Sequence, residues 1–134
     1  MAEIKLAIQN ELINDGIKNL IYTIRNKQVM LDSDVAMLYH YETKKINQAV
    51  KRNIDRFPER FCFKLTKNEF EILRSQIVTS NKGGTRYMPF AFTEQGVSML
   101  SSVLRSDAAI QVNIAVMRAF VAMRNYITTT TTLT

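Results

Sequence analysis

The sequence has little cysteine and little histidine, with one residue of each, Cys62 and His40. A single cysteine excludes disulfide frameworks and cysteine-rich metal sites, and Cys62, between two phenylalanines, is predicted to be a small buried hydrophobic residue. A single histidine excludes a multi-histidine metal cluster, and its predicted place in a turn argues against a Ser/His/Asp relay. We therefore expect no bound metal, no cofactor and no redox chemistry.

The sequence also lacks a leader peptide and an unbroken apolar run. Residues 1–20 mix charged and amide side chains with the apolar ones, unlike the apolar core of a signal peptide. The content of 46% hydrophobic and 22% charged residues is typical of a globular protein. We expect one domain over residues 1–127, a disordered tail over residues 128–134, a cytoplasmic location and no membrane partner.

Acidic residues are scarce in the segment 43–67, which holds eight cations and two acids. This difference equals the whole formal charge of +6, so the rest of the chain holds equal numbers of basic and acidic residues. A positive field confined to one segment is expected of a protein that binds a polyanion, because neutralised phosphates release counterions. A solvated basic face without a partner is the alternative, and the position of the charges on a folded element has to decide between the two.

The spacing of apolar residues predicts an α+β fold, in which a helix-turn-helix of winged-helix type packs on a small antiparallel sheet with a long C-terminal helix. The predicted helices are residues 3–14, 34–39, Thr43 to near Pro58, 67 to about 78, a helix from Thr93 onwards, and 107–127. A hairpin is predicted in residues 17–31, with its turn at Arg25 to Gln28. The other predicted strands are the segments "FCFKLT" and "YMPFAF". Pro89 in the last segment suggests that this strand lies at an edge of the sheet.

Polar residues ahead of the predicted helices indicate where those helices begin. Asp32 or Ser33 is the predicted N-cap of the helix over residues 34–39, and Thr43 is the predicted cap of the next helix. Thr66 and Glu69 have the spacing of a capping box. Thr93 is predicted to cap the helix that follows it, with Glu94 at the positive end of the helix dipole.

The helices over residues 34–39 and 43–55, joined by a three-residue turn, have the dimensions of a helix-turn-helix. On the second helix, Ile46, Val50 and Ile54 fall in one arc and are expected to anchor the helix in the core. The opposite side carries lysine, arginine and amide side chains, with Asp55 as its one acid. Such groups can donate to guanine or phosphate and can pair with adenine, so we expect this helix to enter the major groove of double-stranded DNA.

The candidate DNA contacts divide by their position on this helix. Near its start, Lys44, Asn47 and Gln48 are predicted to read bases, since this part of a recognition helix approaches the base edges most closely. The other basic residues are predicted to bind the phosphate backbone: Lys45, Lys51, Arg52 and Arg56. In the loop "NKGGTRY", Lys82 and Arg86 are candidates for a wing that contacts a neighbouring groove, although a plain flexible connection fits the same residues equally well.

Other functions fit the sequence less well. A solvated surface helix is the simplest alternative to DNA binding, and RNA binding lacks the expected GxxG clamp or exposed aromatic sheet. Glu94 in "FTEQG" is explained better by the helix dipole than by acid–base catalysis. The pair Asp32 and Asp34, at a helix start, is explained better by capping than by a carboxylate active site. We therefore expect no enzyme, no catalytic residues and no small-molecule substrate.

The segment 107–127 is apolar on nearly every side and is rich in methionine and branched residues. Such a helix either runs through the core or meets a copy of itself, and we expect a homodimer. A dimer also suits a helix-turn-helix that binds two half-sites. The main alternative function is a protein-interaction module that binds and inactivates a repressor through this helix.

Two blocks of the sequence, "ETKKINQAVKRN…RFP" and "FTEQGV", are distinctive. With the residues around them, over about 17–125, they resemble the ORF-six N-terminal domain of phage and bacterial proteins, a relative of the KilA-N and Bro-N domains. The resemblance implies a compact α+β DNA-binding module, often N-terminal to an effector part in antirepressor-like regulators. It places the DNA-contacting helix at residues 43–53, with Lys44, Lys45, Lys51 and Arg52 as its basic positions, and the family commonly has glycine at the position of His40. We expect a double-stranded DNA-binding module of a phage- or prophage-type transcriptional regulator or antirepressor.

Overall fold

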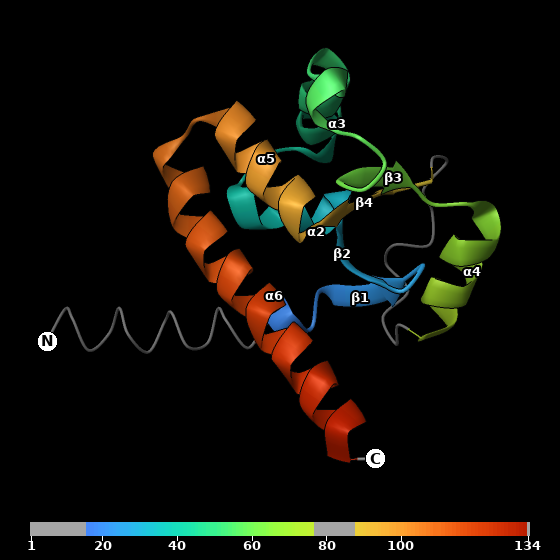
Figure 1. Ribbon diagram of the computed structural model, residues 1–134. Helices are drawn as coiled ribbons and strands as arrows, with labels where there is room; N and C mark the ends of the chain where they lie inside the picture. The colour runs from blue at the N-terminus through green and yellow to red at the C-terminus, as the bar shows by residue number, and fades with distance from the viewer. Residues whose placement is uncertain (1–15, 77–87, 134) are drawn as a thin grey trace, which may run out of the picture.

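The computed structural model describes residues 16–76 and 88–133, with side chains as far as residue 125. The strands are β1 (Ile21–Ile24), β2 (Lys27–Leu31), β3 (Cys62–Lys64) and β4 (Phe90–Thr93). The helices are α2 (Asp32–Tyr39), α3 (Thr43–Arg52), the 3-10 turn η1 (Ile54–Arg56), α4 (Lys67–Gln76), α5 (Glu94–Leu104) and α6 (Asp107–Leu133) (Figure 1). The predicted α+β class with a long C-terminal helix is confirmed. The predicted helix 3–14 and the predicted wing lie outside the described residues.

The four strands form one antiparallel sheet in the order β1-β2-β4-β3. Side chains alternate between its two faces, as the pleat requires. Met30, Cys62 and Phe92 belong to a core shared with α2, α3, α5 and α6. Val29, Phe63 and Ala91, on the other face, pack with Phe70 and Leu73 of α4. The sheet therefore lies between α4 on one side and the remaining helices on the other (Figure 1).

The hairpin of β1 and β2 is confirmed, but its turn is shorter than predicted. Ile24 pairs with Lys27, so only Arg25 and Asn26 form the turn, and Gln28 lies within β2. Both turn residues have positive φ, 56° for Arg25 and 61° for Asn26. Two consecutive positive φ values are typical of a type I′ turn, whose twist matches that of the flanking strands.

Pro89 was expected to mark an edge strand, and this expectation is wrong. β4 lies in the interior of the sheet, between β2 and β3. Pro89 directly precedes Phe90, the first residue of β4, so its missing N–H removes no bond from the ladder. Its carbonyl oxygen accepts a hydrogen bond from Leu65 N at 3.0 Å.

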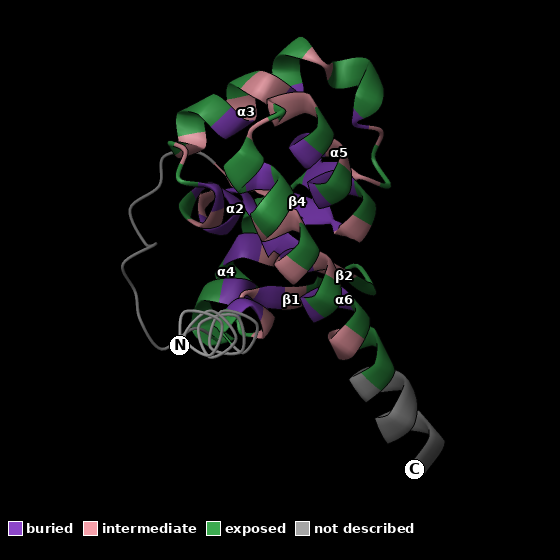
Figure 2. Cartoon of the chain, turned by 90° about the vertical axis from the view of Figure 1, so that its left-hand side faces the viewer, coloured by how far each residue is buried: buried purple, intermediate pink, exposed green. Residues whose placement is uncertain are grey.

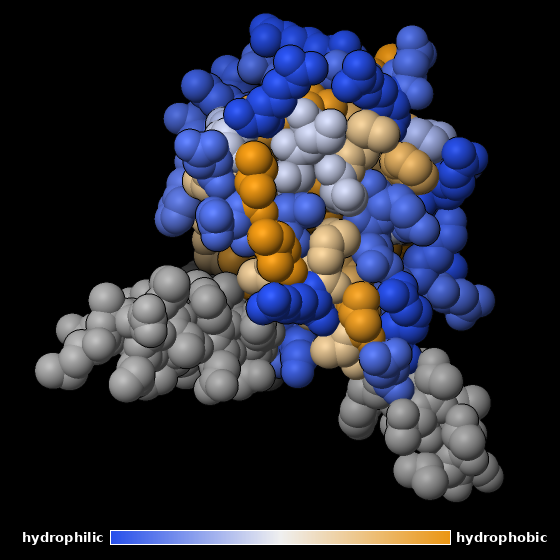
Figure 3. Space-filling view, turned by 60° about the vertical axis from the view of Figure 1, so that its left-hand side comes forward, coloured by the Kyte–Doolittle hydropathy of each residue, from blue (hydrophilic) through white to orange (hydrophobic). Residues whose placement is uncertain are grey.

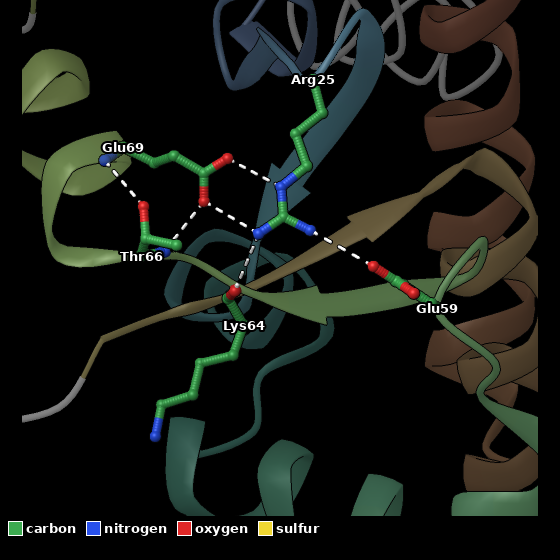
Figure 4. Close-up of polar contacts among 5 residues, drawn as sticks. All are labelled: Arg25, Glu59, Lys64, Thr66 and Glu69. Carbon is green, nitrogen blue, oxygen red and sulfur yellow. Dashed lines mark hydrogen bonds and ion pairs between the residues drawn. The ribbon is translucent and has the colours of Figure 1, made fainter.

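A charged cluster at the hairpin turn holds the start of α4 (Figure 4). Arg25 donates from Nε to Glu69 Oε2 at 2.7 Å and from Nη2 to Glu69 Oε1 at 3.0 Å, while its guanidinium group lies 4.2 Å from the centre of the Phe63 ring. Thr66 and Glu69 exchange the two bonds of the predicted capping box, at 2.8 and 3.1 Å. One arginine thus connects the β1–β2 turn to both β3 and α4.

Two of the predicted helix starts differ from the structure. α2 begins at Asp32 with Leu31 as its N-cap, and α3 begins at Thr43 with Glu42 as its N-cap. Neither cap residue makes a side-chain cap bond. At α5 the prediction is confirmed, since Thr93 Oγ1 accepts a bond from Gly96 N at 3.3 Å. α6 continues past its predicted end at Ile127 to Leu133, while the disorder expected of the tail stays a prediction.

The block "FTEQG" has a packing role in this fold. Thr93 donates from N to Phe61 O at 3.0 Å and from Oγ1 to Arg60 O at 2.9 Å. A Cβ atom on Gly96 would lie 1.9 Å from Phe61 O, a distance that no side chain tolerates. Thr93 and Gly96 therefore fix the loop between η1 and β3 against the start of α5.

Among the described residues, no helix has the length and apolar character needed to span a membrane.

Candidate nucleic-acid interface

The helices α2 and α3 are joined by the three residues His40, Tyr41 and Glu42, as predicted. His40 has φ 59° and ψ 39°, in the left-handed region. Tyr41 N donates to Ala36 O at 2.9 Å and His40 N donates to Met37 O, the pair of bonds that defines a Schellman motif. The turn therefore keeps the conformation that glycine favours, although a histidine occupies the position.

Two side chains anchor α3 in the core. Ile46 and Val50, one turn apart, are buried together with Val35 and Tyr39 of α2. Ile54 was expected to join them, and this expectation is wrong: its side chain is 60% exposed. α3 ends at Arg52, and Ile54 lies in the 3-10 turn that follows, so the α-helical spacing no longer applies to it.

The opposite side of α3 is exposed along its whole length (Figure 2). It carries Lys44, Lys45, Gln48, Lys51 and Arg52, and the exposed Arg56 follows in η1. None of these five cations forms an ion pair with a residue that the structure describes. The helix thus presents positive charge and one amide to solvent, which is the chemistry needed for phosphate and base edges in a groove.

Asn47 differs from its neighbours on α3 because it is half-buried and bonded. Its Nδ2 donates to Asp32 Oδ2 at 3.2 Å, and the same oxygen accepts a bond from Phe90 N at 3.2 Å. Asp32 Oδ1 accepts from Ser33 N at 2.7 Å, so this carboxylate, only 4% exposed, connects α2, α3 and β4. Burial raises the pKa of Asp32, while the three hydrogen bonds favour its charged form.

The Asp32–Asn47 contact was missed in the sequence. Asp32 was predicted to cap α2, but its carboxylate bonds residues 15 and 58 positions away. No local pattern carries that information, because the partners meet only when α3 and β4 have packed. Of the other predicted contacts, Lys82 and Arg86 lie outside the described residues.

Glu94 and Cys62, two other polar residues considered in the sequence, both have structural roles. Glu94 Oε2 accepts a hydrogen bond from Arg124 Nη1 at 2.6 Å, which ties the start of α5 to α6. Cys62 is buried as predicted, and burial raises the pKa of its thiol to about 12. In the part of the chain that the structure describes, no group of histidine, cysteine and acidic side chains is arranged to hold a metal ion.

Comparison with known proteins gives one match. A sequence model of the ORF6N domain family matches residues 19–103 of the chain. The chain belongs to this family. The matched part of the ORF6N domain contains the whole sheet, the helix-turn-helix and nearly all of α5, so it includes the exposed basic face of α3. No curated protein and no solved structure matches the chain.

Proposed function

We propose that this ORF6N domain binds double-stranded DNA by placing the outward face of α3 in the major groove. The observation that carries the proposal is the row of exposed cations, paired with no acid of the described residues, on a helix whose inner side is anchored by Ile46 and Val50. α3 itself contains no acid, and Asp55 in η1 is the one acid among the cations. A solvated helix without a partner would gain nothing from leaving acids out, while a phosphate backbone would be repelled by them.

The side chains of α3 divide into two roles. We assign Lys44 and Gln48, which lie near the start of the helix, to base edges. We assign the other basic residues to phosphates: Lys45, Lys51, Arg52 and Arg56. We assign Asn47 to holding α3 in position, because its amide is already bonded to Asp32.

The family supports a biological setting for this binding. The ORF6N match agrees with a phage-type domain, and we place the chain in a phage- or prophage-type transcriptional regulator or antirepressor.

A second candidate function is binding of a repressor protein through α6, which exposes Ile110, Ile114 and Val121. A mobility-shift assay with random duplex at low salt distinguishes the two, since only DNA binding retards the duplex.

The division of roles is tested by fluorescence anisotropy on duplexes selected from a random pool. Lys51→Ala should lower the affinity for selected and random duplexes by the same factor, because a phosphate contact carries no sequence information. Gln48→Ala should instead lower the affinity for the selected duplex by about 5- to 150-fold and leave random duplex nearly unchanged, as expected for loss of a base contact of about 1–3 kcal/mol.

Lys67→Ala is the matched control for Lys51→Ala, because Lys67 is also an exposed lysine and lies at the start of α4 on the other side of the sheet. It should leave both affinities unchanged. Equal losses from Lys67→Ala and Lys51→Ala would contradict the assignment of the DNA-binding face to α3.

A further inference from the structure

α6 has an apolar row on the side turned away from the core. Its inner side contributes Val116, Ala119 and Phe120 to the main core. Its outer side exposes Ile110 (53%), Ile114 (48%) and Val121 (40%), with the half-buried Met117 between them. Figure 3 shows hydrophobic patches along this side of the molecule, separated by hydrophilic ones. Three exposed branched side chains on one helix face mark a candidate surface for binding another chain.

The row has the spacing of a coiled-coil seam. Ile110, Ile114, Met117 and Val121 follow each other at intervals of four, three and four residues, as the a and d positions of a heptad do. The same spacing continues to Asp107 before the row and to Arg124 after it, and both of these side chains are exposed. We propose that α6 pairs through this seam with α6 of a second copy of the chain, in an antiparallel orientation.

The charges at the two ends of the seam determine the orientation. In an antiparallel pair centred between Ala115 and Val116, Ile110 faces the second copy's Val121, and Ile114 faces its Met117. The same register places Asp107 opposite the second copy's Arg124, at both ends of the interface. A parallel pair would instead set Asp107 against Asp107 and Arg124 against Arg124, which costs free energy.

The bond between Arg124 and Glu94 is compatible with this pairing. It uses Nη1, and a guanidinium group has five N–H donors. The Arg124 side chain is 54% exposed, so its positive charge lies at the surface at the end of the seam. Met117, within the seam, also lines a shallow hollow together with Met99, Phe61 and Ser102, which leaves room for side chains of the second copy.

An antiparallel pair has a consequence for DNA binding, which rests on the function proposed above. In two perpendicular views α3 lies toward the end of the molecule at which α6 begins, far from the C-terminal end of α6 (Figures 1 and 2). Antiparallel pairing of α6 therefore places the two α3 helices at opposite ends of the dimer. Such a dimer presents its basic faces to two separate duplex segments, in contrast to two half-sites one helical turn apart.

Association is tested first, without DNA, by light scattering coupled to size-exclusion chromatography. The unaltered chain should have the mass of a dimer. Ile114→Asp should have the mass of a monomer, with association at least about tenfold weaker, because it buries a charge in the middle of the seam. Ile72→Asp is the control: Ile72 is 53% exposed on α4, outside the seam, and the variant should remain a dimer. A monomeric unaltered chain, or a dimer that survives Ile114→Asp, would overturn the proposal.

Orientation is tested by disulfide cross-linking of single-cysteine additions, with the buried Cys62 left in place. A mixture of Ile110→Cys and Val121→Cys chains should give a cross-linked dimer containing one chain of each, because these positions face each other in the antiparallel register. Ile110→Cys alone should give none. Cross-linking of Ile110→Cys with itself would show a parallel pair and overturn the orientation. Because neither test involves DNA, failure of the dimer is distinguishable from failure of DNA binding.

Discussion

Asn47 and Gln48 are neighbouring amides on α3 with opposite surroundings. Asn47 donates to the buried Asp32, while Gln48 is exposed. Asn47→Ala should lower the free energy of unfolding by about 1–3 kcal/mol, because it removes a hydrogen bond to a buried carboxylate. Gln48→Ala should change it by no more than about 0.5 kcal/mol. Urea denaturation of the two variants measures both values.

This pair of variants also separates stability from binding. Gln48→Ala should retain the fold and lose discrimination between duplexes, whereas the defect of Asn47→Ala should be visible in the absence of DNA. If the two variants unfold at the same urea concentration, then the Asp32–Asn47 bond contributes nothing to the packing of α2 against α3.

At the scale of elements, α4 depends on the contact between Arg25 and Glu69. The hydrogen bonds from Arg25, followed by those from Thr66, lower the pKa of Glu69 from its ordinary value of 4.5 to about 2. The carboxylate therefore stabilises the fold fully above pH 4.5, and this contribution is lost as the pH falls toward 2. Glu69→Gln should lower stability at pH 7 by about 1–2 kcal/mol, since the pair is partly exposed.

The pH dependence identifies the cause of this loss. The difference in unfolding free energy between the unaltered chain and Glu69→Gln should shrink between pH 4.5 and pH 2, as measured by urea denaturation over that range. Glu71→Gln, at an exposed position two residues further along α4, should show no difference at pH 7. A difference for Glu69→Gln that stays constant with pH would mean that its charge is not involved.

The elements that the sequence predicts well are those with local signals. The capping box of Thr66 and Glu69 and the cap at Thr93 depend on residues three apart, and both are confirmed. The strand order does not depend on local signals. Pro89 suggested an edge strand because nothing near it in the sequence shows that β3 and β2 pair on either side of β4.

In the candidate site, too, the features with local signals were predictable and those that depend on long-range contacts were not. The outward face of α3 follows from helical spacing, since Ile46 and Val50 are both buried as expected. The exposure of Ile54 has a local cause, because α3 ends at Arg52 and α-helical spacing does not apply to the 3-10 turn that follows. The role of Asp32 could not be predicted, since its partners Asn47 and Phe90 come close only in the folded chain.

At the scale of the whole molecule, the fold separates its apolar and its basic surfaces. The main core lies between the sheet and four helices, and α3 stands at one end of the molecule with its basic side outward (Figures 1 and 2). The segment 43–67 carries the formal net charge of +6, and α3 and η1 hold most of its cations. The charge is therefore concentrated on a surface that can meet a duplex.

The salt dependence of DNA binding tests this account most directly. If four to six cations of α3 and its surroundings contact phosphates, the logarithm of the association constant should fall against the logarithm of salt concentration with a slope of about −4 to −5. Arg52→Ala should reduce the size of this slope by about 1. Fluorescence anisotropy over a range of salt concentrations measures both slopes. An affinity that does not change with salt, or the absence of binding at low salt, would contradict the proposed function.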